Sequence, residues 1–464
     1  MILFPPKMPS KRLFSLIAIS LLFLNPLMAE GPQYELVNRQ AIDRVWAGNV
    51  ANFDFLTEGS HQYIAYYDAN RQMSVAHRKG PRAPWVYYKV DSWLGWDSHN
   101  YIEMALDADG HLHLSGNMHA NRIEYFRTRY PHDVRSLKRV EVMVDPELEE
   151  RVTYPRFLQS PEGDLIFKYR IGGSGNGNDI YLLYDTESRA WSNLYNGALI
   201  DGQGKMNAYV EGPKTGPDGR FHMVWIWRDT PNAATNHDIS YARSPDLLSW
   251  EDSAGKPIPL PITFERSDVV DPVPPGGGAI NGNVKLGFDS LERPIVAYHK
   301  FDPHGNTQIY VSRREDSGWV LYQVSEWEDF RWDFGGFGAL PEVKVRLGTP
   351  EQLPDGTIRL PVQKEGNRLL FILDGRSLEL LETKDAPPPF PPLLADVVSS
   401  DEVSLDPRNQ TGSKPAFRTR STGGFNDSPD EVFYITWEAQ AAFRDQARET
   451  IPPPSILYLH HLKK

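Results

Sequence analysis

Apolar and polar residues alternate along short runs through most of the chain, as in His61–Tyr67, and Gly, Asp or Pro bounds each run. Successive side chains of a strand point to opposite faces, so a period of two predicts half-buried strands. Helical periodicity is almost absent from the sequence. The pattern therefore predicts an all-β protein made of many short strands.

One turn pattern recurs along the chain and indicates a repeat. In this pattern an acidic residue or Pro stands beside Gly, and the strand that follows begins with an apolar residue or His. Four copies begin at Asp107, Ser160, Gly216 and Leu353. A looser copy without the Gly begins at Asp289. The copies lie about 50 to 75 residues apart, near the length of a propeller blade with its loops. Six or seven blades would fill the chain. We predict a seven-bladed β-propeller of four-stranded antiparallel blades.

Three further segments fit this architecture. Ser455–His461 is expected to share a blade with the N-terminal Tyr34–Val37, which would remove the last open sheet edge. Pro387–Pro392 is predicted to be a rigid loop between blades. Ser244–Trp250 resembles the Asp box of sialidase-type propellers, a structural turn between strands, although its central Gly is missing and it is one residue short. Because fold does not fix function, these features support the propeller alone.

The first 29 residues differ from the rest of the chain. A basic segment precedes the apolar run Leu13–Leu24 and a short exit that ends at Ala29. This order predicts a secretory signal peptide over residues 1–29. No linker or charge block divides residues 30–464, so we expect one β-propeller catalytic domain there. No later run is long and apolar enough to span a membrane, and we expect a secreted or periplasmic protein.

The composition narrows the classes of partner. The net charge of −12 over 464 residues argues against nucleic acid and against an anionic membrane surface. The absence of Cys excludes disulfides, thiolate nucleophiles, cysteine zinc sites and a lipid-modified cysteine after the leader. An acidic polysaccharide would need a locally basic cleft, and the His and Arg residues below are candidates for it. We expect the protein to be a monomer.

Polar residues that could take part in catalysis or substrate binding are concentrated in the second and third repeats. Asp97-Ser-His-Asn100 precedes a predicted strand, and His119 follows His99 by twenty residues. We expect both histidines at strand ends of one blade. A histidine near neutral pH holds either protonation state, which suits proton transfer or the binding of a carboxylate. A structural role is the plainer interpretation of each histidine taken alone.

The next repeat adds Tyr154 and, sixteen residues later, Arg170, directly before the glycine-rich segment 172–177. An Arg at a strand end before a glycine loop suggests an anion contact, and an interblade salt bridge is the alternative. Tyr154 alone would pack in the core with its hydroxyl hydrogen-bonded. The following blade contributes Tyr209 and Arg228, and beside them Trp225 and Trp227, which we expect in the core.

These spacings, together with the run Asn236–Ser244, resemble the BNR-4 propellers that include the ulvan lyases of polysaccharide lyase families 24 and 25. The rhamnosyl-glucuronate lyases of family 42 are close relatives and an alternative. The resemblance spans about residues 45–340 and is firmest over 97–245. It implies a lyase that cleaves 4-O-linked glucuronate or iduronate in a sulfated, rhamnose-containing polysaccharide such as ulvan. The reaction would be a β-elimination that leaves an unsaturated uronate.

The resemblance also implies roles for the candidate residues. Elimination needs a neutralised carboxylate, a base for the C5 proton and an acid for the leaving oxygen. Arg170 would neutralise the carboxylate, with His119 or Asn100 assisting. Tyr154 and His99 would be the proton-transfer pair, with base and acid unassigned, and the Arg170 charge would favour the Tyr154 phenolate. The residues implied to hold flanking sugars are Tyr209 and Arg228, the latter through a sulfate group.

No cofactor is required for this chemistry, and we assign no metal ligand. Some lyases of this group carry a cysteine-containing zinc site, which this chain cannot form. Residues 276–283 and 298–302 would line the central channel or bind a structural Ca²⁺ through oxygen ligands. Tight turns and a hydrogen-bonded core His299 are the plainer interpretation of these segments.

Two other functions compete with elimination. A hydrolase of the sialidase or rhamnosidase kind needs two placed carboxylates, and Asp97 and Asp179 lie near the cluster without forming a recognisable acid/base pair. A non-catalytic glycan-binding propeller would need the aromatic residues and Arg170. Such a binding protein would not need two histidines and Tyr154 at corresponding positions of neighbouring repeats.

Overall fold

The computed structural model describes residues 34–160, 162–340, 342–394, 416–442, 445–448 and 452–464. The predicted signal peptide, residues 1–29, lies outside the described residues. In the described part, strands dominate, and the helical segments are five short 3₁₀ turns. No described helix is long and apolar enough to cross a bilayer. The all-β prediction is confirmed.

The strands form six hydrogen-bonded sheets within the described ranges, and in most of them the strands run in meander order. One contains β2 (Asp54–Glu58), β3 (His61–Tyr67), β4 (Gln72–Lys79) and β5 (Val86–Trp93). The next contains β6 (Ile102–Leu106), β7 (Leu112–Gly116), β9 (Tyr125–Thr128) and β10 (Leu137–Arg139). A third contains β8 (His119–Asn121), β11 (Val152–Gln159), β12 (Leu165–Gly173), β13 (Asn176–Asp185) and β14 (Ala190–Asn193).

Three further sheets complete the described part of the fold. One contains β15 (Asn207–Thr215), β16 (Phe221–Arg228), β17 (Asn236–Ser244) and β18 (Asp268–Asp271). The nine-stranded sheet begins with β19 (Lys285–Phe288), β20 (Pro294–Phe301), β21 (Thr307–Glu315) and β22 (Gly318–Gln323). It continues with β23 (Val345–Leu347), β24 (Glu351–Gln352), β25 (Thr357–Lys364), β26 (Asn367–Asp374) and β27 (Leu380–Asp385). The last contains β28 (Ala416–Gly423), β29 (Glu431–Ala439), β30 (Ser455–Lys463) and β1 (Glu35–Val45).

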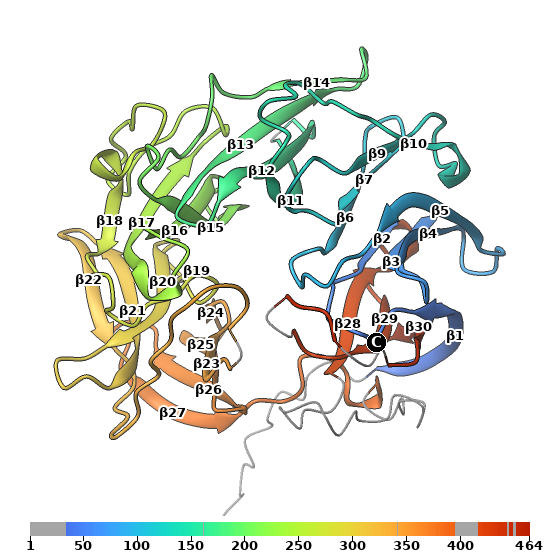
Figure 1. Cartoon of the computed structure of the whole chain (residues 1–464). Helices are drawn as coiled ribbons and strands as arrows, with labels where there is room; N and C mark the ends of the chain where they lie inside the picture. The colour runs from blue at the N-terminus through green and yellow to red at the C-terminus, as the bar shows by residue number, and fades with distance from the viewer. Residues whose placement is uncertain (1–33, 161, 341, 395–415, 443–444, 449–451) are drawn as a thin grey trace, which may run out of the picture.

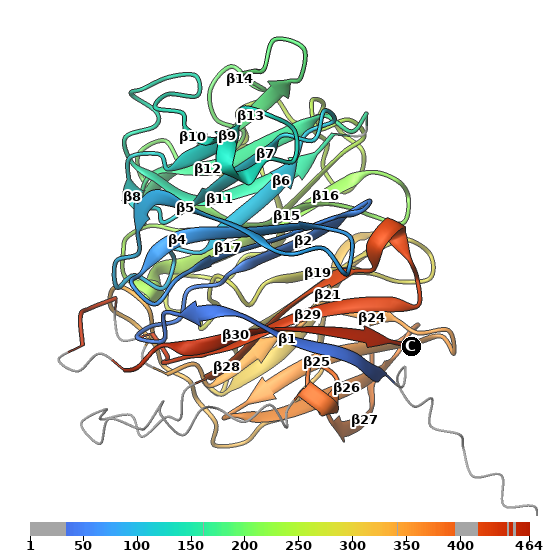
Figure 2. The same cartoon turned by 90° about the vertical axis from the view of Figure 1, so that its right-hand side faces the viewer.

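The sheets are arranged around a common centre in a propeller-like ring (Figure 1). Their first strands, such as β2, β6, β11 and β15, lie innermost, and β5, β10, β14 and β18 lie at the rim. In the chain-end sheet the N-terminal β1 is outermost and pairs with the C-terminal β30, with Arg39 opposite His460 (Figure 2). The prediction that the two segments share one sheet is therefore confirmed.

The recurring turn joins the first and second strands of its meander in every copy. At Asp107 the carboxylate accepts the backbone N–H of Asp109 at 3.1 Å and of His111 at 2.8 Å, which explains the acidic residue. Gly110 has a φ of 82°, the left-handed region that glycine adopts without strain. In the looser copy at Asp289 that place is taken by Glu292, with a φ of 62°. Ser244–Trp250 opens the connection that leads from β17 to β18, in keeping with the structural turn predicted there.

Two sheets differ from the predicted four strands. β8 adds a fifth strand beside β11, through the pairs Val152–Asn121 and Thr153–His119. The runs β19–β22 and β24–β27 join into one sheet through a single parallel pair, Phe288–Glu351. The two runs approach closely because residue 287 is glycine: a Cβ there would collide with the carbonyl oxygen of Pro350.

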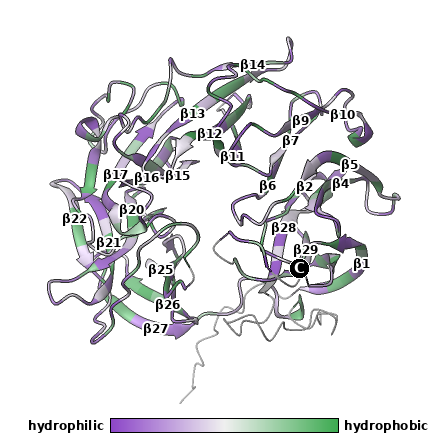
Figure 3. Cartoon of the chain, in the orientation of Figure 1, coloured by the Kyte–Doolittle hydropathy of each residue, from purple (hydrophilic) through white to green (hydrophobic). Residues whose placement is uncertain are grey.

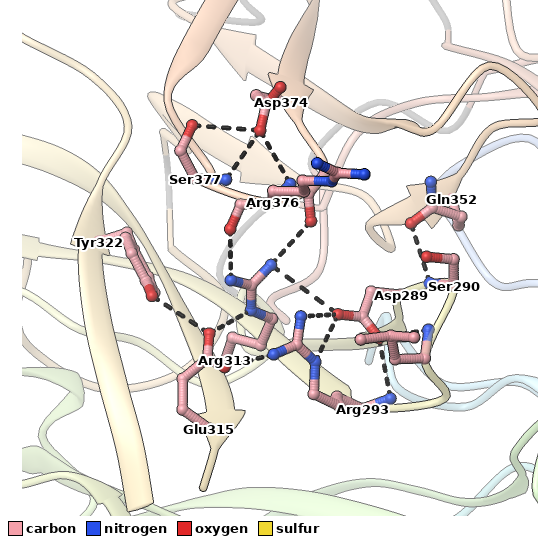
Figure 4. A network of polar contacts seen from close by, with 12 residues as sticks. Asp289, Ser290, Arg293, Arg313, Glu315, Tyr322, Gln352, Asp374, Arg376 and Ser377 are labelled. Atoms are coloured by element: carbon pink, nitrogen blue, oxygen red, sulfur yellow. Dashed lines mark hydrogen bonds and ion pairs between the residues drawn. The ribbon is translucent and has the colours of Figure 1, made fainter. Parts of the chain in front are cut away.

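The same junction carries a polar network (Figure 4). Arg313, only 3% exposed, donates to the carbonyl oxygens of Gly375 at 2.8 Å and Arg376 at 2.6 Å on the neighbouring run. Glu315 accepts from Nε of Arg313 at 2.6 Å. A single guanidinium thus fastens two four-stranded runs together.

Hydrophobic and hydrophilic residues are interspersed along the strands (Figure 3). The buried apolar residues form clusters that join neighbouring sheets. One cluster joins Ile166 and Tyr181 to Trp225 and Trp227 on β16. Both tryptophans are fully buried, so their predicted place in the core is confirmed. Burying each large side chain stabilises the fold by roughly 1.5–3 kcal/mol.

Candidate active site

A pocket of about 290 Å³ brings together residues from β8, β11, β12, β15, β16 and the loops beside them. Six of the seven predicted site residues line it: His99, His119, Tyr154, Arg170, Tyr209 and Arg228. A second cavity of about 330 Å³ shares four of them, His99, Tyr154, Arg170 and Tyr209. These four residues therefore lie where the two cavities meet.

The side chains of His99 and His119 lie side by side, although they come from segments attached to different sheets. His99 lies in the loop before β6, whereas His119 opens β8, which pairs with β11 of the next sheet. The prediction that both end strands of one blade is wrong in this respect, because three residues of β8 cross to the neighbouring sheet. The two ring centroids are 4.3 Å apart.

Asp97 is the residue that holds this pair. His99 Nδ1 lies 2.7 Å from Oδ1 of Asp97, and His119 Nδ1 contacts Oδ2 of the same carboxylate. Burial raises the pKa of Asp97, but the hydrogen bonds from His119 and His99 outweigh it and hold that pKa well below its usual range. Since each Nδ1 is engaged by Asp97, each imidazole has its Nε2 on the side away from the carboxylate.

The surroundings of His99 favour its charged form. Burial lowers the pKa of His99, but the hydrogen bond and charge of Asp97, with the charge of Asp445, raise it above the ordinary value. Asp445 comes from the far end of the chain: its Oδ2 lies 3.8 Å from His99 Nδ1, and its Oδ1 accepts from Ser98 N and Oγ at 3.0 and 2.9 Å. No sequence signal pointed to Asp445.

Tyr154 sits in a local distortion of β11. Its φ is 59°, and the register of β11 against β12 shifts between Thr153 and Arg156. A non-glycine residue with this φ inside a strand is strained, and such strain gathers at functional sites. The ring centroid of Tyr154 lies 5.9 Å from that of His99 and 4.8 Å from Cζ of Arg170.

Arg170 on β12 is buried without a counterion. Its side chain is 3% exposed, and its Nε and Nη1 are buried with no hydrogen-bond partner among the described residues. Its close neighbours are the rings of Tyr154 and Tyr209. The nearby Asp179 instead lies 2.9 Å from Lys168 Nζ. Within the described part of the chain Arg170 forms no salt bridge, so its guanidinium is available to an anion in the pocket.

Burial decides the protonation state of Tyr154. Burial and the neighbouring Tyr209 raise its pKa, while Arg170 and Arg228 lower it, and the result is about 12. Arg170 lowers the pKa of Tyr154, as its charge predicts, but burial outweighs the charges of Arg170 and Arg228, so the phenol is favoured over the phenolate. At neutral pH Tyr154 is a neutral phenol that can donate a proton.

Arg228 and Tyr209 are joined by a hydrogen bond within a larger set of contacts. Arg228 donates from Nε to Thr230 O at 3.0 Å, from Nη1 to Tyr209 Oη at 3.3 Å, and from Nη2 to Pro231 O. The Tyr209 hydroxyl also lies 2.6 Å from Ser174 Oγ. These contacts occupy all three nitrogens of Arg228 and fix Tyr209 in the wall of the pocket.

Asn100 is absent from the lining of both cavities. It is buried behind His99, where its Nδ2 donates to Asn117 Oδ1 at 3.1 Å. Its Oδ1 is buried without a hydrogen-bond partner among the residues that the structure describes. A direct contact of Asn100 with substrate stays a prediction.

Two groups of residues contain atoms of the kind that bind metal ions. Candidate ligand atoms of Asp97, His99 and His119 lie within 4.8 Å of one another, but the Nδ1 atoms are already hydrogen-bonded to Asp97. In the segment proposed for Ca²⁺, Asp302 accepts the backbone N–H groups of His304 and Asn306, both at 2.9 Å. Buried His299 Nε2 lies 3.1 Å from Asn283 Nδ2. These contacts are those of turns and a core histidine, and Ca²⁺ stays a prediction.

Sequence reasoning missed several residues of the site. Asp97 was noted only as a nearby carboxylate, although its place two residues before His99 was a usable signal. Ser174 lies in the glycine-rich turn after Arg170 and reaches Tyr209. Trp332 and Arg346 line the pocket from segments that carry no motif.

Comparisons with known proteins agree with this architecture. The model of the BNR repeat-containing family matches residues 61–327. The long isoform of ulvan lyase from Alteromonas sp is 24% identical over 236 residues, which cover 41% of this chain and 23% of that protein. The long isoform from Pseudoalteromonas sp. (strain PLSV) matches to the same extent. The chain thus aligns with about a quarter of the length of these relatives.

Among solved structures, the polysaccharide lyase Uly1 has a TM-score of 0.59 at 14% identity, covering 92% of this chain and 99% of that chain. An ulvan lyase of family PL25 has a TM-score of 0.56 at 13% identity, covering 90% and 95%. At these identities the likeness concerns the fold. Since the family model covers more than half of the sequence, the chain belongs to the BNR repeat-containing family.

Proposed function

We propose that this protein is a polysaccharide lyase that cleaves ulvan at a 4-O-linked uronate by β-elimination. The observation that carries the proposal is the buried, unpaired guanidinium of Arg170 beside Tyr154 and His99. The curated relatives named ulvan lyase support it, as does a structural neighbour, TM-score 0.55, bound to -[GlcA(1-4)Rha3S]-. That fragment carries a uronate and a sulfate, so an anionic substrate fits the basic pocket.

Arg170 is proposed to receive the uronate carboxylate. A buried charge without a partner is unfavourable by several kcal/mol, and an incoming carboxylate removes that penalty. Arg170 lines the pocket, and its guanidinium can donate charge-assisted hydrogen bonds to that carboxylate. Neutralising the carboxylate makes the C5 proton more acidic, which is the first requirement of elimination.

His99 and Tyr154 are proposed to move the protons. Tyr154 keeps its proton at neutral pH because its pKa is about 12, so we assign it to protonate the leaving oxygen. His99 then serves as the base for the C5 proton through Nε2, after it has lost its own proton. Asp97 positions both histidines by accepting from their Nδ1 atoms, and His119 assists at the carboxylate.

The carboxylates near the site do not favour a hydrolase. A glycosidase acid needs a raised pKa, whereas the pKa of Asp97 is lowered by its two histidine partners. Asp179 is paired with Lys168. No observation favours the hydrolase or the non-catalytic binder over the lyase.

The experiment is to incubate the purified protein with ulvan and follow both ultraviolet absorbance and reducing ends. Elimination yields a conjugated unsaturated uronate, so absorbance and reducing ends should rise together. Reducing ends without absorbance would mean a hydrolase. Tests on rhamnosyl-glucuronate side chains distinguish the family 42 alternative.

We further propose that residues 30–464 form one seven-bladed propeller, secreted as a monomer after removal of residues 1–29. The count of seven follows if β19–β22 and β24–β27 are two blades that touch at one pair. N-terminal sequencing of exported protein and its mass in solution test the processing and the oligomeric state.

A further inference from the structure

Asp445 is a largely buried carboxylate close to the active site that lines neither of its cavities. It lies in the connection between β29 and β30, and its side chain is 12% exposed. Its φ of 58° is in the left-handed region, which Asp and Asn adopt more readily than most residues with a Cβ. The backbone at this position therefore favours Asp or Asn.

Two carboxylates hold consecutive backbone amides of the loop that carries His99. Oδ1 of Asp445 accepts the backbone N–H of Ser98 at 3.0 Å and the Ser98 hydroxyl at 2.9 Å. Oδ1 of Asp97 accepts the next backbone N–H, that of His99, at 2.8 Å. Asp97 belongs to the loop itself, whereas Asp445 anchors the loop to a segment from the other end of the chain.

The second oxygen of Asp445 joins His99 to another part of the pocket. Oδ2 lies 3.8 Å from Nδ1 of His99 and accepts the backbone N–H of Ala339 at 3.3 Å. Ala339 lines the same cavity as His99. One carboxylate thus links the loop of His99 with a second segment of the cavity wall.

The connection that carries Asp445 is itself held to the protein. Arg448 donates from Nε to the carbonyl oxygen of Gly48 at 3.0 Å, and the backbone N–H of Gln440 donates to the carbonyl oxygen of Ala47 at 2.9 Å. A side chain on an anchored segment can fix the geometry of the group that it contacts.

Several ionisable groups face His99 within the described ranges. They are Asp97 of the same loop, His119 of β8, Tyr154 of β11, Arg170 of β12 and Asp445 of the β29–β30 connection. Asp97 and Asp445 favour a positive charge on His99, whereas Arg170 opposes it.

We propose that Asp445 is a positioning residue of the lyase, which fixes the loop of His99 and stabilises the imidazolium that forms during elimination. The inference rests on the proposed function. In that step the C5 proton moves to Nε2 of His99, and the electron pair of the C–H bond becomes the C4–C5 double bond. The C4–O4 bond breaks, and O4 takes its electron pair and the proton of Tyr154. Since His99 gains a positive charge, a second carboxylate beside it lowers the barrier.

Asp445→Asn tests this role because it removes the charge and keeps an oxygen that can accept from Ser98. We expect kcat on ulvan to fall by about tenfold, less than for a group that transfers the proton itself. The carboxylate raises the pKa of His99, so the rise of kcat/KM with pH should move to lower pH in the variant. The melting temperature should stay close to that of the wild type.

Asp185→Asn is the matched control. Asp185 likewise accepts a backbone N–H, from Glu187 at 2.9 Å, and a serine hydroxyl, from Ser188 at 2.7 Å, and it lines neither cavity. This change should leave kcat and the pH profile unaltered.

A purely structural role of Asp445 predicts a different pattern. Asp445→Asn would then match the wild type at every pH, and only Asp445→Ala, which also removes the contacts with Ser98, would lose activity and stability. That result would overturn the proposal.

An NMR titration of the His99 ring in the intact protein separates this inference from the lyase itself. The titration midpoint should be lower in Asp445→Asn than in the wild type or in Asp185→Asn. An unchanged midpoint would refute the role of Asp445 whether or not ulvan is cleaved. A lowered midpoint without any unsaturated product would refute the lyase and keep the coupling between Asp445 and His99.

Discussion

Asp97 holds His99 and His119 through the two oxygens of one carboxylate, with His99 Nδ1 at 2.7 Å and the two rings 4.3 Å apart. One residue therefore fixes which nitrogen of each imidazole carries the proton and which is left for the substrate. The arrangement joins a loop before β6 to a strand of the next sheet. The relative position of the two histidines therefore depends on how these two sheets pack together.

Asp97→Asn should change the pH dependence of the reaction. The carboxylate raises the pKa of His99, and His99 acts as a base only when neutral, so kcat/KM of the wild type should rise with pH through that raised pKa. Without the charge the rise should occur at lower pH, and the maximal rate should fall by roughly 100-fold. Asp218→Asn, which alters a similar contact with His222 outside both cavities, should leave the profile unchanged. An unmoved profile in Asp97→Asn would remove Asp97 from this role.

Arg170→Met should separate activity from stability. Loss of the guanidinium should lower kcat/KM by at least about 100-fold, as expected for a group that stabilises developing charge. The free energy of unfolding should stay equal or rise by about 1 kcal/mol, because a buried, unpaired charge is removed. Denaturant unfolding of wild type and variant measures this. A loss of several kcal/mol would instead indicate a structural ion pair.

Histidines at the junction of β3, β4 and the loop after β9 should make the fold sensitive to acid. The rings of His61 and His132 are 3.7 Å apart, and His61 Nδ1 lies 2.9 Å from His77 Nε2. Burial, and then the neighbouring histidines, lower the pKa of His77 to about 4; burial, His132 and Lys79 do the same for His61. The unfolded chain binds protons first, so stability should fall as the pH drops from about 6.5 towards 4.

The melting temperature measured across that pH range checks this prediction. His77→Gln should reduce the slope, because one proton-binding group is removed from the stack. His304→Gln, at an exposed turn, is the control and should not change it. A slope unaffected by His77→Gln would contradict the assignment.

Arg313→Met should loosen the junction of the nine-stranded sheet. The change removes the side-chain donor of the carbonyl oxygens of Gly375 and Arg376. It also removes one of the donors of Glu315, which still accepts from Arg293 and Tyr322. Breaking a buried network of this kind costs about 3–5 kcal/mol. Arg376→Met alters an exposed side chain at the same junction and should cost little. Equal unfolding free energies for the two variants would argue against the network.

Local signals carried most of the fold prediction. Alternation within His61–Tyr67 and the turn at Asp107 depend on neighbours a few residues away, so the sequence displays them directly. The reach of Asp445 to Ser98 across 347 positions depends on closure of the ring, which no local pattern encodes. The pKa of Tyr154 required knowing how deeply it is buried, and charge alone suggested the opposite direction.

The central claim is that the glycosidic bond breaks by elimination at the His99–Tyr154–Arg170 site. The most direct measurement is mass spectrometry of ulvan fragments formed in water enriched in heavy oxygen, by the wild type and by Tyr154→Phe. The account predicts unsaturated products without heavy oxygen from the wild type and almost no product from the variant. Saturated products that carry heavy oxygen, or full turnover by Tyr154→Phe, would contradict it.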